Sequence, residues 1–397
     1  MPSDPDRRAL VQEQLRKADV DALVCGLPAN VLLLSGYWPV VGTSLAIVVR
    51  DGPTVLLVPE DEKELAEHGG ADEIHTYKPS PLDTLANLIE TQSPPLAALA
   101  RKLSLQRKRL GHEHGGWFEA SSYAAMHLYR SSLTAILERA FDYPHLIDMD
   151  EQLTYLRAIK TPQELERIRL ACRIAAEAFE QGRRQMQVGM KETEVAERFR
   201  APLSIHGVGR EGVERAGGFT FCMSGPNSAK ASGAFARSQD RKLGDSDLIL
   251  VHCNSYADGY WTDITRTYCL GEPDKKQQAL FDAIAEAHRA ARDVIRPGAR
   301  AADVDRAARA VLEKHGLAKA FKHSTGHGIG FSAINHLALP RLHPQAPDIL
   351  ETGMVFNVEP AVYLEGYGGI RHCNMVALTA NGVEQLTPFQ AIGERPA

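Results

Sequence analysis

The N-terminal part of the chain alternates between helical hydrophobic patterns and short runs rich in β-branched residues. Residues 7–17 have the spacing of an amphipathic helix, and residues 22–26 have the composition of a strand. Residues 45–50 and 54–59 read as two strands of a hairpin, because an Asp-Gly pair lies between them. The alternation predicts a small α/β domain at this end of the chain.

A second region begins with a long helical pattern after Thr161. Thr161 is placed as the N-cap, Pro162 stands at the first helical position, and Glu164 at the third can complete a capping box. One helix face should then carry a mostly apolar stripe, formed by Leu165, Ile168, Arg169, Cys172 and Ala176. We therefore expect two domains, residues 1–155 and 156–397.

The second region contains a weak internal repeat. Residues 178–207 resemble residues 287–316 at a shift of 109 residues (287 − 178). The shift matches Gly189 to Gly298, and a His-Gly pair ends both segments. Two copies of a helix-turn-helix unit around a shared sheet would give this pattern, with a site between the halves. Chance similarity between two amphipathic helices is the alternative.

Composition narrows the classes of function. The 397 residues carry a net charge of −5, so no broad positive field favours nucleic acid. The first ten residues lack the apolar core of a secretory signal, and no apolar run approaches the ~20 residues of a spanning helix. We expect a cytoplasmic protein without membrane contact. Six cysteines without CxxC spacing indicate neither a disulfide framework nor a zinc ribbon.

Candidate metal ligands gather in the C-terminal half of the chain. Six of the fifteen histidines fall within residues 315–372. An Asp-Gly pair predicts a hairpin that places Cys253 opposite Thr262, with two ligand candidates near the crossing. Carboxylates and an imidazole suit zinc, manganese or iron, and a second imidazole and a thiol would add nitrogen and sulfur. The five candidates are His252, Asp263, His327, Glu359 and Cys373.

Four segments, in this order, resemble the family that contains Xaa-Pro dipeptidase, aminopeptidase P, methionine aminopeptidase and creatinase. They are LILVHCNSYADGYWTDITRTY, HSTGHGIG, MVFNVEPAVY and GGIRHCNMV. The N-terminal segment VDALVCGLPANVLLLSGYW resembles the small domain that precedes the catalytic domain in Xaa-Pro dipeptidases and creatinase. The resemblance implies an α/β (α+β) fold, with a creatinase-like N-terminal domain followed by a pita-bread domain that has a pseudo-twofold repeat.

The resemblance also implies where the metal ligands stand. The family pattern selects the same five positions, but it has carboxylates where this chain has His252 and Cys373. Four carboxylates balance two divalent ions in that pattern, whereas two carboxylates and one thiolate balance a single ion far better. We therefore expect one divalent ion, zinc, manganese or iron, or none. His252 is expected as a ligand or as a base.

Three further side chains match family positions that act on substrate. His323 and Arg371 stand at such positions, and His323 is a candidate general acid or base. The next family histidine is displaced by two residues, to His336. Ser232 stands where the family has a substrate-binding histidine.

Three residues beside the candidate ligands are expected to be structural. Arg266, in DITRT, is expected to orient a carboxylate. His372 and Asn374 flank Cys373, so strand alternation should point them away from the face that Cys373 uses.

Three functions follow from this set. The first is a hydrolase that cleaves a C–N bond of a short peptide or a small amide-like molecule with one divalent ion. The second is a metal-free, creatinase-like hydrolase or lyase that acts on a small polar molecule. The third is a catalytically silent relative that binds a ligand. The resemblance also implies a homodimer.

Overall fold

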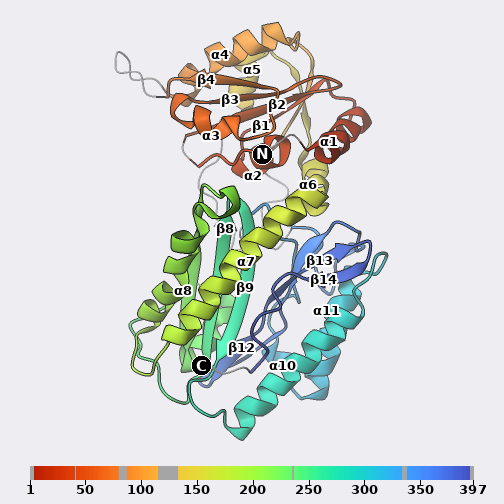
Figure 1. Ribbon diagram of the computed structural model, residues 1–397. Helices are drawn as coiled ribbons and strands as arrows, with labels where there is room; N and C mark the ends of the chain where they lie inside the picture. The colour runs from red at the N-terminus through yellow and green to blue at the C-terminus, as the bar shows by residue number, and fades with distance from the viewer. Residues whose placement is uncertain are drawn as a thin grey trace. The chain divides into compact units, whose positions relative to one another are not determined.

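The computed structural model describes residues 4–40, 42–79, 87–114, 133–234, 237–332 and 338–393 (Figure 1). The chain separates into two compact units, and the division falls between Arg157 and Ala158. This point lies inside helix α6 (Asp150–Ala158), which also contains the boundary expected at residues 155 and 156. Each unit has a hydrophobic core of its own.

The N-terminal unit is a six-stranded mixed sheet with helices packed on it. Its strand order is β4-β3-β2-β1-β5-β6. The strands are β1 (Ala22–Cys25), β2 (Leu45–Val49), β3 (Thr54–Pro59), β4 (Glu73–Tyr77), β5 (Arg109–His112) and β6 (His145–Asp148). The helices are α1 (Pro5–Lys17), α2 (Pro28–Ser35), α3 (Lys63–Glu67), α4 (Leu88–Lys102) and α5 (Leu133–Ala140). The predicted hairpin is confirmed, because β2 and β3 pair antiparallel.

A buried carboxylate ties the ends of β1 and β5 together in this unit. The Oε1 atom of Glu113 accepts hydrogen bonds from the backbone N–H groups of Gly26 (2.7 Å) and Leu27 (2.6 Å). Its Oε2 atom accepts one from Nδ2 of Asn30 at 2.7 Å. Burial nevertheless raises the pKa of Glu113. Three donors on one carboxylate make this residue a structural link.

The first half of the C-terminal unit packs two helices on an antiparallel sheet, in the order β7-β8-β9. Its elements, in chain order, are α7 (Pro162–Gln185), α8 (Glu192–Gly207), β7 (Ala216–Ser224), the short α9 (Ala231–Ala234), β8 (Ile249–Ala257) and β9 (Tyr260–Tyr268). The predicted capping box at Thr161 is confirmed. The buried stripe of α7 is rotated from the predicted one and contains Ile168, Ala171, Cys172, Ile174, Ala175 and Ala178.

The second half has its own pair of helices, α10 (Lys275–Asp293) and α11 (Ala301–Lys314). Its strands form a sheet in the order β10-β13-β14 and a separate pair, β11-β12. They are β10 (Val355–Val358), β11 (Ala361–Leu364), β12 (Gly368–Arg371), β13 (Asn374–Thr379) and β14 (Gly382–Gln385). Figure 1 shows α7 and α8 beside β8 and β9, and α10 and α11 beside the strands of the second half.

The structure supports the internal repeat. Helices α8 and α11 begin at Glu192 and Ala301, which are 109 residues apart (301 − 192). Gly189 and Gly298 precede them with φ values of +86° and +82°, a backbone region that favours glycine. The two copies therefore share a turn as well as a helix.

The hairpin of β8 and β9 turns at Asp258 and Gly259, as predicted. Its register pairs Cys253 with Ile264, so the prediction that Cys253 lies opposite Thr262 is wrong. A two-residue turn fixes the register of the whole pair, and counting from it places His252 opposite Thr265.

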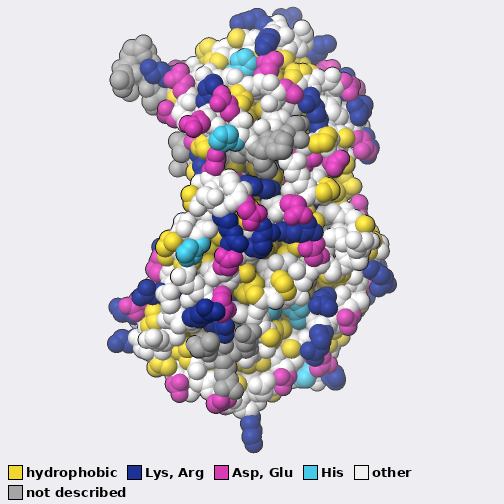
Figure 2. Space-filling view, viewed as in Figure 1, with side chains coloured by type: hydrophobic (Ala, Val, Ile, Leu, Met, Phe, Trp, Pro, Cys, Tyr) yellow, Lys and Arg dark blue, Asp and Glu magenta, His cyan; other side chains and the backbone are white. Residues whose placement is uncertain are grey.

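The surface mixes charges of both signs. Figure 2 shows Lys and Arg side chains interspersed with Asp and Glu over the face that it views. On the C-terminal unit, Arg173 pairs with Glu211 at 2.9 Å and Arg167 with Asp258 at 2.6 Å. All six cysteines are buried, and none forms a disulfide. No helix in the described part of the chain has both the length and the apolarity needed to cross a bilayer.

Candidate metal centre

The candidate site begins on one face of the β8–β9 hairpin. The other face carries Val251, Cys253 and Ile264 into the core beneath α7 and α8. Because side chains alternate along a strand, the opposite face presents His252 and Asp263. The nine-residue strands thus bring both predicted ligands of the first half to one surface, where His252 Nδ1 lies 3.7 Å from Asp263 Oδ1.

A glycine-flanked loop brings His327 to the same place. The backbone N–H of His327 donates to Oδ1 of Asn357 on β10 (2.6 Å), and the backbone N–H of Asn357 donates to the carbonyl of His327 (3.0 Å). A Cβ at Gly326 would lie 2.0 Å from the Asn357 carbonyl oxygen, and one at Gly328 would lie 2.0 Å from that of Leu339. Only glycine fits at these two positions.

Backbone hydrogen bonds fix the two remaining ligand candidates. The N–H of Glu359 donates to the Thr325 carbonyl at 2.7 Å, and the N–H of Cys373 donates to the Thr265 carbonyl at 3.0 Å. The second bond forms an isolated bridge between β9 and the segment that joins β12 to β13. Both halves of the unit therefore meet at Cys373.

The side chain of Arg266 holds this junction together by hydrogen bonds to backbone carbonyls. Its guanidinium nitrogens donate to the carbonyls of Thr265 (2.9 Å) and Cys373 (2.6 Å), and also to those of Thr387 and Phe389. The expectation that Arg266 orients a carboxylate is therefore wrong. A fully buried guanidinium with carbonyl partners serves as a structural anchor.

His372 and Asn374 agree with their expected structural role. The ring of His372 packs edge-on against His288 at 5.8 Å, and Asn374 Oδ1 accepts from Arg266 at 2.8 Å.

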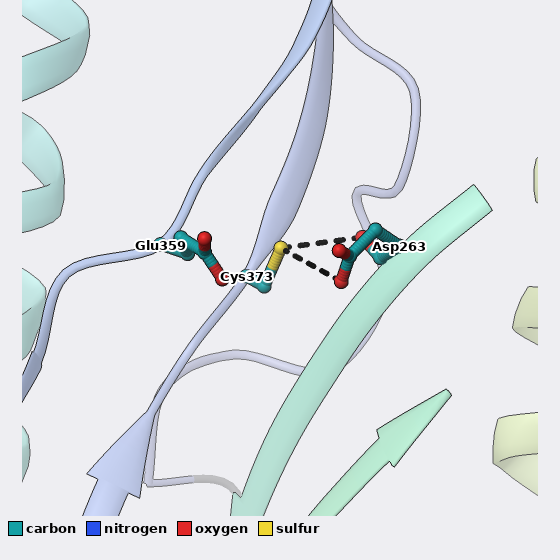
Figure 3. Close-up of side chains that lie close together, drawn as sticks. All are labelled: Asp263, Glu359 and Cys373. Carbon is teal, nitrogen blue, oxygen red and sulfur yellow. Dashed lines mark hydrogen bonds between the residues drawn. The ribbon is translucent and has the colours of Figure 1, made fainter. Parts of the chain in front are cut away.

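Asp263, Glu359 and Cys373 bring their ligating atoms within 4.8 Å of one another, and all three are buried. Figure 3 shows the sulfur of Cys373 between the two carboxylates. The thiol lies 3.2 Å from the backbone carbonyl of Asp263 and 3.8 Å from its Oδ1 atom. Ligands about 2.0 to 2.3 Å from one ion lie within about 4.6 Å of one another, so a small inward shift would fit this set to one ion.

The protonation of this cluster reflects its burial. Burial, together with the charge of Asp263, raises the pKa of Glu359 to about 8. Burial also raises the pKa of the Cys373 thiol well above its usual value, and both carboxylates add to the effect. A bound cation acts in the opposite direction and favours a carboxylate and a thiolate. Buried acidic groups that outnumber the nearby positive charge of Arg371 thus form a cluster suited to a cation.

The imidazole of His327 is oriented as a metal ligand usually is. Its Nδ1 atom lies 2.9 Å from the carbonyl of Gly328, which can only accept, so Nδ1 carries the proton. Its Nε2 atom then has the lone pair, which accepts from Nδ2 of Asn357 at 3.3 Å and lies 3.7 Å from Oδ2 of Asp263. A ligating histidine typically donates its other N–H to such a carbonyl.

His252 is placed differently. Its Nδ1 atom lies 2.9 Å from Oγ1 of Thr265, and its Nε2 atom lies 3.0 Å from Oδ1 of Asn254. Burial, assisted by the nearby cation of Arg371, lowers the pKa of His252 to about 4. The ring is therefore a neutral imidazole at pH 7, and both its nitrogens already have partners.

Arg371 reaches the site from β12. Its Nε atom donates to Thr265 Oγ1 at 3.0 Å and lies 3.9 Å from Oε2 of Glu359. Burial alone would lower the pKa of Arg371, but interactions with Tyr363 and Glu359 outweigh it and raise that pKa. Arg371 thus brings a permanent positive charge to the cluster.

Of the other candidate catalytic residues, His323 is half-buried at the side of β11. Its Nε2 atom lies 2.9 Å from the hydroxyl of Tyr363, and its Nδ1 atom lies 2.7 Å from the Ser324 carbonyl. His336 falls outside the described residues, so its position stays a prediction.

Three partners of these residues were not predicted from the sequence. Thr265 and Asn254 form the hydrogen bonds of His252, and the ring of Phe221 on β7 stacks parallel to that imidazole at 6.5 Å. Thr265 and Asn254 each stand two residues after a candidate ligand. Strand alternation was therefore the signal that could have found both.

Comparison with known proteins identifies the same two parts of the chain. Metallopeptidase family M24 matches residues 166–380, and the creatinase/prolidase N-terminal domain matches residues 7–159. The chain is 26% identical to the Xaa-Pro dipeptidase of Pyrococcus horikoshii over 375 residues, 94% of this chain and 95% of that one. It is 31% identical to the Xaa-Pro dipeptidase of Pyrococcus furiosus over 239 residues, 60% of this chain and 66% of that one.

Solved structures share the fold along nearly the whole chain. The prolidase from Pyrococcus horikoshii OT3 superposes with a TM-score of 0.77 at 24% identity, and covers 98% of this chain and 99% of its own. The Xaa-Pro dipeptidase from Bacillus anthracis gives 0.79 at 22% identity, with 98% of both chains covered. The chain therefore belongs to metallopeptidase family M24, in the hydrolase superfamily of Xaa-Pro dipeptidases and aminopeptidases P, and carries a creatinase/prolidase N-terminal domain.

Proposed function

We propose that this protein hydrolyses a C–N bond in short peptides with one divalent metal ion, held by Asp263, His327, Glu359 and Cys373. The observation that carries the proposal is the buried cluster of two carboxylates and a thiol, with their ligating atoms within 4.8 Å of one another. The lone pair of His327 faces Asp263 and supplies the fourth donor. Four protein ligands of these types suit zinc, and the hydrolytic role would require a fifth position for water or the substrate carbonyl, because a closed tetrahedral site has no open position.

The charges of the cluster favour one ion over two. The two carboxylates and a thiolate carry three negative charges, and Arg371 contributes one positive charge. One divalent ion neutralises the remainder, whereas a second would leave two uncompensated positive charges in a buried site. Uncompensated charge of this kind costs several kcal/mol.

Among divalent ions, the donor set favours zinc, followed by iron and manganese. Thiolate sulfur and imidazole nitrogen are softer donors than the carboxylates and water that suit manganese. Such an ion, when bound, polarises a carbonyl group or lowers the pKa of a water molecule.

The chain supplies the remaining groups from the second half of the unit. His323 accepts at Nε2 from Tyr363, because its Nδ1–H donates to the Ser324 carbonyl, so this pair can hold or move a proton near the substrate. Arg371 provides a fixed cation for an oxygen of the substrate.

The substrates that we propose are Xaa-Pro dipeptides and related short peptides, because relatives of the chain carry the name Xaa-Pro dipeptidase. The cytoplasmic location and the homodimer stay predictions.

Elemental analysis of the purified protein, together with turnover of a dipeptide panel, tests the proposal. About one equivalent of zinc, iron or manganese per chain, and activity that a chelator removes and that ion restores, is the expected result. Two equivalents would overturn the charge argument. Turnover unaffected by chelator would instead support a metal-free hydrolase or lyase, and binding of dipeptides without turnover a silent relative.

A further inference from the structure

A chain of buried hydrogen bonds runs along the β8–β9 hairpin. Arg371 Nε donates to Thr265 Oγ1 at 3.0 Å, and this oxygen lies 2.9 Å from Nδ1 of His252. On the other side of the ring, Nε2 lies 3.0 Å from Asn254 Oδ1. The Asn254 amide nitrogen then points to the backbone carbonyl of Thr262 at 3.5 Å.

The two ends of this chain fix the direction of every bond in it. A guanidinium can only donate and a carbonyl can only accept. The hydroxyl of Thr265 accepts from Arg371, so its own proton is available to Nδ1 of His252. The Asn254 amide nitrogen faces a carbonyl, so its oxygen faces His252 and requires a proton on Nε2.

This proton arrangement leaves His252 a single lone pair, at Nδ1, and the hydroxyl of Thr265 already occupies it at 2.9 Å. Its Nδ1 lone pair accepts from the hydroxyl, and its Nε2 atom carries a hydrogen. The tautomer of His327 is the reverse, since its Nδ1–H donates to the Gly328 carbonyl, and its Nε2 lone pair lies 3.7 Å from Asp263 and accepts a longer bond of 3.3 Å from Nδ2 of Asn357. Two neighbouring histidines thus adopt opposite tautomers, and the lone pair of His252 is held by the shorter hydrogen bond.

The second observation concerns the Nη2 atom at the other end of the Arg371 guanidinium. The Nη2 atom of Arg371 is buried and has no hydrogen-bond partner among the described residues. The residue is only 5% exposed, and its Nε atom is anchored on Thr265. A buried donor without a partner is rare in native proteins and commonly marks the place of a missing ligand or water.

We propose that His252 is a positioning residue rather than a metal ligand, and that through Thr265 it holds Arg371 so that Nη2 binds an oxygen of the substrate. The part that concerns substrate rests on the proposed hydrolase function. In this arrangement the guanidinium supplies, at a fixed place, the positive charge that a second ion would otherwise provide. Phe221, stacked parallel to His252, keeps the plane of the ring.

The tautomers can be measured without any activity. Nitrogen-15 spectra of metal-free protein labelled at histidine should show His252 protonated at Nε2 and His327 protonated at Nδ1. The variants His252→Asn and His327→Asn assign the two signals by their disappearance. Addition of zinc chloride should move the Nε2 resonance of His327 and leave both nitrogens of His252 in place. A proton on Nδ1 of His252, or a zinc-dependent shift of its Nε2 resonance, overturns the proposal.

Removal of the hydroxyl between the two residues tests the positioning role. In Thr265→Val, we expect kcat for a dipeptide to fall about tenfold or more, which is about 1.4 kcal/mol or more. The zinc content should stay at that of the wild type. Thr220→Val on β7 is the matched control for burial, because its buried hydroxyl contacts the thiol of Cys253 on the core face of the hairpin. Loss of zinc in Thr265→Val alone would contradict the proposal.

Arg371→Lys tests the bond to substrate, because lysine keeps the charge and lacks the Nη2 arm. We expect kcat to fall about tenfold or more with zinc content unchanged, whereas Arg241→Lys, at an arginine paired with Asp247, should lower neither. An Arg371→Lys variant with wild-type kcat overturns the substrate part. If the wild type cleaves no peptide, the hydrolase proposal fails, while the tautomer and zinc measurements still decide the role of His252.

Discussion

Two buried glutamates, one in each unit, show how the same side chain serves two purposes. Glu113 accepts three hydrogen bonds, two from backbone N–H groups and one from Asn30. Glu359 has a hydrogen bond with Asn357 and a long contact of 3.9 Å with Arg371, and it lies beside another carboxylate. Burial raises the pKa of both residues, to about 8 for Glu359.

The two glutamates differ in the groups that compensate the negative charge of the carboxylate. A carboxylate surrounded by fixed donors is compensated within the fold, so its removal harms the fold. Glu359 faces a thiol and a second carboxylate, and Arg371, 3.9 Å away, offsets only part of their charge, so we propose that a metal ion compensates the rest. The surroundings of a buried acid, more than its burial, separate a structural residue from a ligand.

The largest expected effect comes from Glu359→Gln. The variant should lose dipeptide hydrolysis by about 1,000-fold or more, which is about 4 kcal/mol, because a neutral amide is a poor ligand. The metal-free variant should unfold at the same urea concentration as the wild type or a higher one, since a group that strains the fold when charged is gone. Steady-state kinetics and urea titration measure the two quantities. A variant that keeps full activity would remove Glu359 from the site.

Glu113→Ala should show the opposite pattern. It leaves three buried donors without their acceptor and should lower the free energy of unfolding by roughly 3 kcal/mol. The metal content per folded chain should not change, because Glu113 lies in the other unit. Circular dichroism during urea unfolding and elemental analysis give both numbers. Loss of metal without loss of stability in Glu113→Ala would contradict the structural role that we assign to Glu113.

Carboxylates at positions 252 and 373, where the family pattern has them, should change the number of metal ions bound per chain. The double variant His252→Asp with Cys373→Glu has the donors of the family pattern, and we expect it to bind two divalent ions per chain. The single variant Cys373→Ser keeps one weak donor and should bind one ion about tenfold or more weakly than the wild type. Isothermal titration with zinc measures stoichiometry and affinity. Two ions in the wild type, or one in the double variant, would contradict the charge argument.

The smallest effect is a pH dependence of the metal-free protein between about pH 7 and 8. The folded pKa of Glu359, about 8, exceeds its ordinary value of 4.5, so the folded protein keeps a proton that the unfolded chain has released. Stability should therefore fall as the pH rises through this window. His252, with a pKa of about 4 in the folded protein and an ordinary value of 6.5 in the unfolded chain, is mostly neutral in both states there. Thermal unfolding at a series of pH values tests this slope, which Glu359→Gln should abolish.

Much of the fold could be predicted because its signals are local. The capping box at Thr161 and the Asp-Gly turns of two hairpins each depend on a few neighbouring residues, and the 109-residue repeat appears as the same local turn and helix in two places. The buried stripe of α7 was predicted only in part, with Ile168 and Cys172 correct, because this helix buries apolar residues on more than one side.

The site was harder to predict, because side-chain partners are not local. Motif spacing selected Asp263, Glu359 and Cys373, which the structure brings together. The proton arrangement of His252 depends on Thr265 and Asn254, whose importance appears only once the hairpin register is known. Arg266 was assigned to a carboxylate because its carbonyl partners come from segments more than 100 residues away.

The glycines on either side of His327 determine how the candidate metal site can be redesigned. They fix the path of the backbone so tightly that no larger residue fits, while the donor atoms beside it belong to replaceable side chains. A library of variants that randomises positions 252 and 373 and keeps the glycines at 326 and 328 would therefore change the side chains of the site without changing the backbone of the loop around His327. The backbone that shapes the site and the side chains that set its chemistry can therefore be varied independently.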